Sequence, residues 1–170
     1  SFKFSIFETK VLSNSNWYNF LLRFSIFETD VLFKHKSCKF SFKLNIGCPK
    51  KFEPSKEVRN WVKRNNKKIF IYNDPKKAVN GADVIFSDKV ISLNDKVNKK
   101  KKIDHFKKFK IDKKLMCFAK KDCVFLHCLP RGSEVSDEVF LGNKSHVWQQ
   151  ALNRVHVQKS ILLYCFGKLR

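Results

Sequence analysis

Two short segments carry the side chains whose types and spacing suit chemistry. The first, Asp88 to Leu93, contains a carboxylate and the hydroxyl of Ser92. The second, His127 to Arg131, offers an imidazole, a thiol and a guanidinium. Carboxylates and thiolates can orient or accept a proton when they lie within hydrogen-bonding reach of a substrate. Either segment alone is ambiguous, so the hypothesis depends on the elements that position them.

Apolar runs lead into both segments and predict buried strands. These runs are Asp83–Ser87 and Cys123–Cys128, and the second is almost uninterrupted. In open parallel sheets, ligands bind beyond the carboxyl ends of the strands. We therefore expect the two segments to meet at one sheet edge if the two strands are neighbours.

The rest of the chain after residue 41 alternates between strand and helix patterns. Ser55 is expected to cap one helix and Pro75 to begin another that closes at Gly81. Alternation of this kind predicts an α/β fold, a doubly wound three-layer αβα domain with a parallel, Rossmann-like sheet. Further expected elements are strands at Phe42–Cys48 and Lys68–Tyr72, helical turns within Ile103–Lys120, and a final helix at Ser145–Tyr164 with an apolar stripe at Trp148, Ala151, Leu152, Val155 and Leu162.

A repeated block distinguishes residues 1–41, which we set apart as an atypical Phe-rich segment. Phe4–Leu12 reads FSIFETKVL and Phe24–Leu32 reads FSIFETDVL, so the two copies differ at one position. A tandem duplication or a gene-level rearrangement explains such a pair, and so do two genuine short strands. Residues 42–170 form the expected domain.

Charge admits polyanion binding but does not identify a partner. The net charge is +21, with 36 Lys and Arg against 15 Asp and Glu. The densest run, Lys96–Lys114, has few aromatic residues spaced for base stacking and matches no nucleic-acid motif. A solvated lysine face is the preferred interpretation, and a basic polyanion-binding module stays open as an alternative.

The six cysteines do not form a metal-binding or disulfide pattern. There is no Cys-x-x-Cys pair, and His35, His105 and His146 have no partners at metal-ligand spacing. Neither a leader peptide nor a run of about 18 apolar residues is found. We expect a soluble, cytoplasmic protein with reduced thiols, no metal, no cofactor and no membrane segment.

Three motifs occur in an order that resembles the ornithine carbamoyltransferase family. They are the Asp-x-x-x-Ser loop at Asp88, the His-Cys-Leu-Pro loop at His127, and the Asn-Arg-x-His helix at Asn153. Gly47-Cys48-Pro49 and Phe52-Glu53-Pro54 are similar to the opening of the family's second, ornithine-binding domain. Aspartate carbamoyltransferases have Pro where Cys128 stands, which favours a diamino acid as acceptor.

The resemblance implies a role for each motif residue. Asp88, Ser92 and Leu93 would contact the amino acid group of ornithine, with Leu93 in place of the family's usual Met. Cys128 and Leu129 would lie where ornithine meets the carbamoyl group of carbamoyl phosphate. Arg154 would polarise the carbamoyl carbonyl. Asp88, Cys128 and Arg154 are the candidate catalytic residues, and we expect them to face one crevice.

The resemblance also implies a second half. The family's donor motifs, Ser-x-Arg-Thr and His-Pro-x-Gln, are not found in this sequence. We therefore expect a truncated or rearranged gene product that is inactive alone, although the complete enzyme would be a homotrimer of arginine biosynthesis. Related transferases share His-Cys-Leu-Pro, so putrescine or acetylornithine stays open as the acceptor. The loop Glu134–Glu138 is expected to be exposed and mobile beside the substrate.

Overall fold

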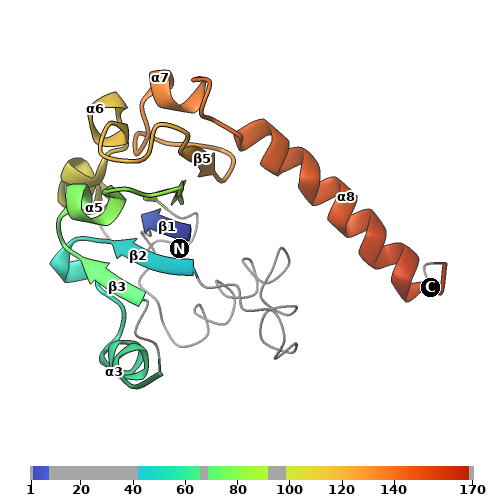
Figure 1. Ribbon diagram of the computed structural model, residues 1–170, viewed down its shortest axis with the longest axis horizontal. Coiled ribbons are helices and arrows are strands. Elements are labelled where there is room, and N and C mark those ends of the chain that lie inside the picture. Colours follow the sequence, from blue (N-terminus) through green and yellow to red (C-terminus); the bar gives the residue numbers. More distant parts are fainter. Residues whose placement is uncertain (1, 8–41, 66–68, 92–98, 169–170) are drawn as a thin grey trace.

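The computed structural model describes residues 2–7, 42–65, 69–91 and 99–168. Its centre is a five-stranded sheet in the order β3-β2-β1-β4-β5, and every neighbouring pair is parallel (Figure 1). The strands are β1 (Phe2–Phe7), β2 (Phe42–Gly47), β3 (Ile69–Tyr72), β4 (Val84–Ser87) and β5 (Val124–His127). This order is that of a doubly wound αβα domain, so the Rossmann-like prediction is confirmed.

Burial explains why the inner strands are apolar. Leu44, Asn45 and Ile46 of β2 are all buried, as expected for a strand covered on both faces. In β4 and β5 burial alternates, and Ile85 and Phe125 lie side by side in register with no exposed surface. The apolar runs of the sequence therefore became strands because both sheet faces are covered.

The central strand comes from the Phe-rich segment, residues 1–41, and not from the expected domain. Phe2–Phe7 pairs with β2 on one side and β4 on the other, with Phe4 opposite both Leu44 and Val84. Residues 42–170 therefore supply four of the five strands, and the central one lies outside them. The reason is topological: β2 and β4 lie on either side of one central slot, and the first FSIF copy occupies it. The second copy lies outside the described residues.

Short helices cover the sheet and close the core. Asp74 caps α4 (Pro75–Val79) by accepting from the N–H of Lys76, and Gly81, at φ +64°, ends this turn as expected. Asp112 caps α6 in the same way through the N–H of Leu115. The remaining short elements are η1 (Lys50–Phe52), α3 (Lys56–Asn65), α5 (Lys99–Phe106), η2 (Lys107–Phe109), α6 (Lys113–Met116) and α7 (Asp137–Phe140).

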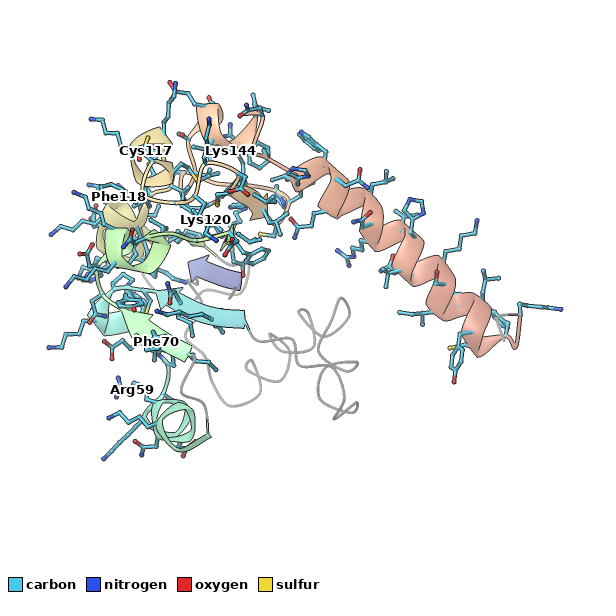
Figure 2. All side chains as sticks on the ribbon, viewed as in Figure 1. Arg59, Phe70, Cys117, Phe118, Lys120 and Lys144 are labelled. Carbon is cyan, nitrogen blue, oxygen red and sulfur yellow. The ribbon has the colours of Figure 1, made fainter. Side chains whose placement is uncertain are left out.

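The last helix, α8 (Val147–Cys165), leaves the body of the domain as a long arm (Figure 1). Val147 is fully buried, but the stripe beyond it is not covered: Trp148, Leu152, Val155 and Leu162 are each more than half exposed. Figure 2 shows the outer part of α8 with no other described helix or strand beside it. In the described part of the chain, no helix is long and apolar enough to cross a membrane.

Candidate functional site

The candidate site lies where the order in which the chain adds strands to the sheet reverses. From β1 the chain fills the sheet outward to β2 and β3, then crosses to β4 and β5 on the other side. Where the order reverses, the carboxyl ends of the strands leave a crevice. Asp88 directly follows β4 and Cys128 directly follows β5, so both begin loops at this edge.

The structure brings Asp88 and Cys128 into direct contact. The thiol of Cys128 donates to Oδ1 of Asp88 at 2.8 Å, and the N–H of Lys89 donates to the same oxygen at 2.8 Å. Burial raises the pKa of Cys128 to about 12, with further contributions from the charge of Asp88 and the hydrogen bond to it. The pair is thus a neutral thiol beside a carboxylate, which can orient or accept a proton.

A buried carboxylate lies behind this pair. Glu134 is 7% exposed, and its Oε2 accepts from the N–H of Val90 at 3.3 Å. Its Oε1 accepts from the N–H of Gly132 and lies 3.1 Å from Nε2 of His127, close but not aligned as a hydrogen bond. Burial opposes its ionisation, yet the contacts with His127, Gly132 and Val90 outweigh burial and lower the pKa of Glu134.

Arg154 lies on α8 and is exposed. Among the described residues no contact joins it to Asp88 or Cys128. One turn earlier on the same helix face, Gln150 accepts through Oε1 from the N–H of His127 at 3.1 Å. A residue four positions later lies about 6 Å further along the axis. Arg154 therefore lies one helical turn further from the carboxyl end of β5 than Gln150 does, exposed and outside the Asp88–Cys128 pair.

The other predicted site residues divide into two groups. Ser92 and Leu93 lie outside the described residues. Leu129 is 45% exposed and precedes a cis peptide bond to Pro130. Arg131, whose role the sequence left undecided, pairs with Asp137 and stacks over the ring of Phe140 at 4.8 Å. Its guanidinium is therefore held against α7.

Sequence reasoning missed two positioning residues and misjudged one loop. Glu134 and Val135 are buried, so the expectation that Glu134–Glu138 is an exposed loop is wrong at its start. The sequence does contain a signal for the burial of Glu134, which lies two residues after Gly132 and directly before the apolar Val135. Gln150 had no such signal, because only the approach of α8 to β5 gives its amide a partner.

The exposure of the lysine-rich run Lys96–Lys114 is also less uniform than expected. Lys99 begins α5, and Lys102 within that helix is 2% exposed. Lysines are rarely buried this completely, because their stems pack while their charged ends stay in water or meet a partner. The described part of this run also buries Phe106, Phe109 and Ile111, so it is not a wholly solvated face.

No group of three or more His, Cys, Asp or Glu side chains that could hold a metal occurs in the described ranges. The cysteines described there are free thiols: Cys48, Cys117, Cys123, Cys128 and Cys165.

Comparison with known proteins identifies the family of the chain. Residues 33–165 match the family model of the aspartate/ornithine carbamoyltransferase Asp/Orn-binding domain. Ornithine carbamoyltransferase of Rhodopseudomonas palustris is 44% identical over 137 residues, which are 79% of this chain and 44% of that protein. The Bradyrhizobium diazoefficiens enzyme is 40% identical over 138 residues, 80% of this chain and 45% of that one. The chain thus spans less than half the length of these curated relatives.

Solved structures agree in fold. Anabolic ornithine carbamoyltransferase of Campylobacter jejuni superposes with a TM-score of 0.63 at 32% identity, over 75% of this chain and 44% of that one. A mitochondrial ornithine carbamoyltransferase of Coccidioides immitis gives 0.64 at 25% identity, over 95% of this chain and 46% of that one. These likenesses agree with a Rossmann-like αβα domain. The chain belongs to the aspartate/ornithine carbamoyltransferase family.

Proposed function

We propose that this chain is the ornithine-binding half of an ornithine carbamoyltransferase. The observation that carries the proposal is the 2.8 Å contact between Cys128 and Asp88 at the topological switch edge. It joins the two motif loops that carry the family resemblance. The reaction proposed is carbamoyl phosphate plus ornithine to citrulline plus phosphate, in arginine biosynthesis.

The amine chemistry supports distinct roles for the two loops. The side-chain amine of ornithine loses a proton and its nitrogen attacks the carbamoyl carbon, after which the carbon–oxygen bond to phosphate breaks. Asp88 is the group that can orient the amine and accept its proton, since the thiol of Cys128 is held protonated. Cys128 and Leu129 would line the junction of the two substrates.

The remaining predicted contacts complete the proposed site. Ser92 and Leu93, on the loop that begins at Asp88, would hold the amino acid head of ornithine. Arg154 would aim its guanidinium at the carbamoyl oxygen, where negative charge grows in the transition state. Gln150, one turn earlier on the same helix, contacts the end of β5, and this supports the assignment.

The donor site is proposed to belong to the family's other half. A phosphate dianion needs several backbone amides and arginines, and the Ser-x-Arg-Thr and His-Pro-x-Gln motifs do not occur in these 170 residues. Carbamoyl phosphate and the trimer are therefore attributed to the complete enzyme. The free thiols fit a reducing compartment, and we propose the cytoplasm.

Binding by the chain itself tests the proposal. Titration of the 15N-labelled chain with ornithine, putrescine and acetylornithine, followed by NMR, should show saturable shifts with ornithine at the lowest concentration. Asp88→Asn should weaken ornithine binding at least tenfold, about 1.4 kcal/mol. Asp104→Asn, an exposed carboxylate on α5, is the matched control and should bind as the parent does.

Each contrary result has a defined meaning. Saturable binding that favours putrescine or acetylornithine would replace ornithine by another acceptor. A folded chain that binds none of the three amines, or whose binding survives Asp88→Asn, would remove the amine-site proposal.

A further inference from the structure

We propose that Glu134 is a positioning residue that joins the loop after β4 to the loop after β5. In doing so it holds Asp88 and Cys128 at hydrogen-bonding distance. The consequence for ornithine rests on the function proposed above. We call these contacts of Glu134 with the two loops the clamp. The clamp can be tested without any substrate.

The two oxygens of Glu134 bind different loops. Oε2 accepts from the N–H of Val90, two residues after Asp88. Oε1 accepts from the N–H of Gly132 and lies 3.1 Å from Nε2 of His127, the residue before Cys128. One carboxylate thus contacts both sides of the Asp88–Cys128 pair.

Burial makes this arrangement selective for a carboxylate. A buried charge is costly unless donors meet it, and here two backbone N–H groups donate to the carboxylate while the ring of His127 lies 3.1 Å from it. The same contacts lower the pKa of Glu134, so the folded loops favour its ionised form. An amide in its place would turn an NH2 group toward a neighbouring N–H donor.

Gly132 provides the space for the clamp. A Cβ on this residue would lie 2.7 Å from Oε2 of Glu134, closer than side chains tolerate. Glycine therefore permits the carboxylate to fold back onto its own loop while it reaches Val90. A substitution here pushes on the clamp without changing any charge.

The experiment measures the alkylation rate of each cysteine by mass spectrometry in the full chain. The main variant is Glu134→Asp, which keeps the negative charge but is one methylene too short to contact both loops. With the loops released, Asp88 no longer restrains the thiol, so Cys128 should react at least threefold faster at pH 8. That factor corresponds to about one unit of pKa after allowance for lower nucleophilicity.

Controls separate positioning from general loosening. Cys123, which is 1% exposed and directly precedes β5, should stay slow in the same sample. Glu138→Asp shortens an exposed carboxylate of the same segment and should leave Cys128 unchanged. Gly132→Ala should accelerate Cys128 as Glu134→Asp does, whereas Ser133→Ala should not.

The pH profile of Cys128 alkylation supplies a further readout, because a merely structural loss would not shift it relative to Cys123. An unchanged rate at Cys128 in folded Glu134→Asp would overturn the proposal, and so would equal acceleration of Cys123. If the variants do not fold, hydrogen exchange in the parent decides. Protected amides at Val90 and Gly132 support the clamp, and rapid exchange at both refutes it. None of these outcomes depends on ornithine binding.

Discussion

Asp88 and Cys128 differ in their capacity to accept a proton. From sequence, either group was a candidate acceptor, since a carboxylate and a thiolate can both take a proton from an amine. In the fold, burial and the neighbouring charge of Asp88 hold the pKa of Cys128 at about 12. Cys128 is then a hydrogen-bond donor at neutral pH, which leaves Asp88 as the candidate proton acceptor of the pair.

Glu134 should leave a signature in the acid stability of the chain. Its folded pKa is lowered below the ordinary 4.5, so it contributes stability above that pH and loses the contribution as pH falls through the lower folded value. Urea unfolding should therefore show Glu134→Gln less stable than the parent at pH 7, with the difference narrowing below about pH 4.5.

Glu138→Gln is the matched control for this titration, because that carboxylate is exposed on the same segment. It should follow the parent over the whole range. A Glu134→Gln deficit that stays constant down to pH 3 would show that the residue acts through packing and not through its charge.

At the scale of elements, the sheet depends on a strand that lies far from the others in sequence. β1 is paired on both sides, with β2 and with β4, so its removal would expose the backbone groups of two strands. The second FSIF copy, at Phe24–Phe27, has the same letters and hence the same preference for a central strand.

We predict that deletion of residues 1–20 preserves a cooperative fold, because the second copy can take the central slot. Residues 28–41 would then span to β2, and 14 residues reach up to about 46 Å when extended. Deletion of residues 1–41 should abolish cooperative unfolding. Circular dichroism during thermal and urea denaturation measures both.

A proline provides the matched control for the shorter deletion. Ile26→Pro within the 21–170 chain removes an N–H that the central ladder would need, so that variant should not fold cooperatively. If the parent deletion is already unfolded, or if Ile26→Pro has no effect, the second copy does not replace the first.

At the scale of the whole molecule, α8 is a surface without a described partner. Leu162, Tyr164 and Phe166 are 58%, 74% and 75% exposed, so the end of the helix is under-packed. The net charge of +21 opposes association of two copies, and salt screens that repulsion. The apolar contribution to the free energy of association remains when salt screens the charges.

We predict that the chain self-associates and that association increases from low to 0.5 M salt. Each large apolar side chain covered in the process contributes roughly 1.5 to 3 kcal/mol. In sedimentation velocity, Leu162→Lys with Phe166→Lys should restore the monomer, while Gln158→Lys with Ser160→Lys adds equal charge at exposed polar positions and should not. A parent that stays monomeric at high concentration and high salt would contradict this.

We propose that catalysis needs the family's other half as well as this chain. Holding donor and amine together is worth roughly 7 to 11 kcal/mol of barrier, and these 170 residues lack the family's donor motifs. The chain alone, incubated with carbamoyl phosphate and ornithine, should form citrulline no faster than the uncatalysed mixture. Citrulline above that rate, abolished by Arg154→Ala, would prove this expectation wrong.

Local patterns in the sequence were enough to predict four of the strands, one helix start and the two loops of the candidate site. Apolar runs predicted four strands to within a residue or two, Asp74-Pro75 predicted the start of α4, and the loops after Ser87 and His127 identified the site edge. Such features depend on neighbours in the chain, so periodicity, capping residues and the directions of parallel strands are enough to predict them.

Tertiary structure decided the rest, because each remaining feature joins residues distant in sequence. The slot for β1 exists only between β2 and β4, and the first FSIF copy looked atypical because its partners begin some 40 and 80 residues later. Glu134 reads as a surface carboxylate until Val90, 44 residues away, donates to it. The sequence by itself determined which groups could do chemistry, whereas burial and long-range pairing decided which of them are held together and in which protonation state.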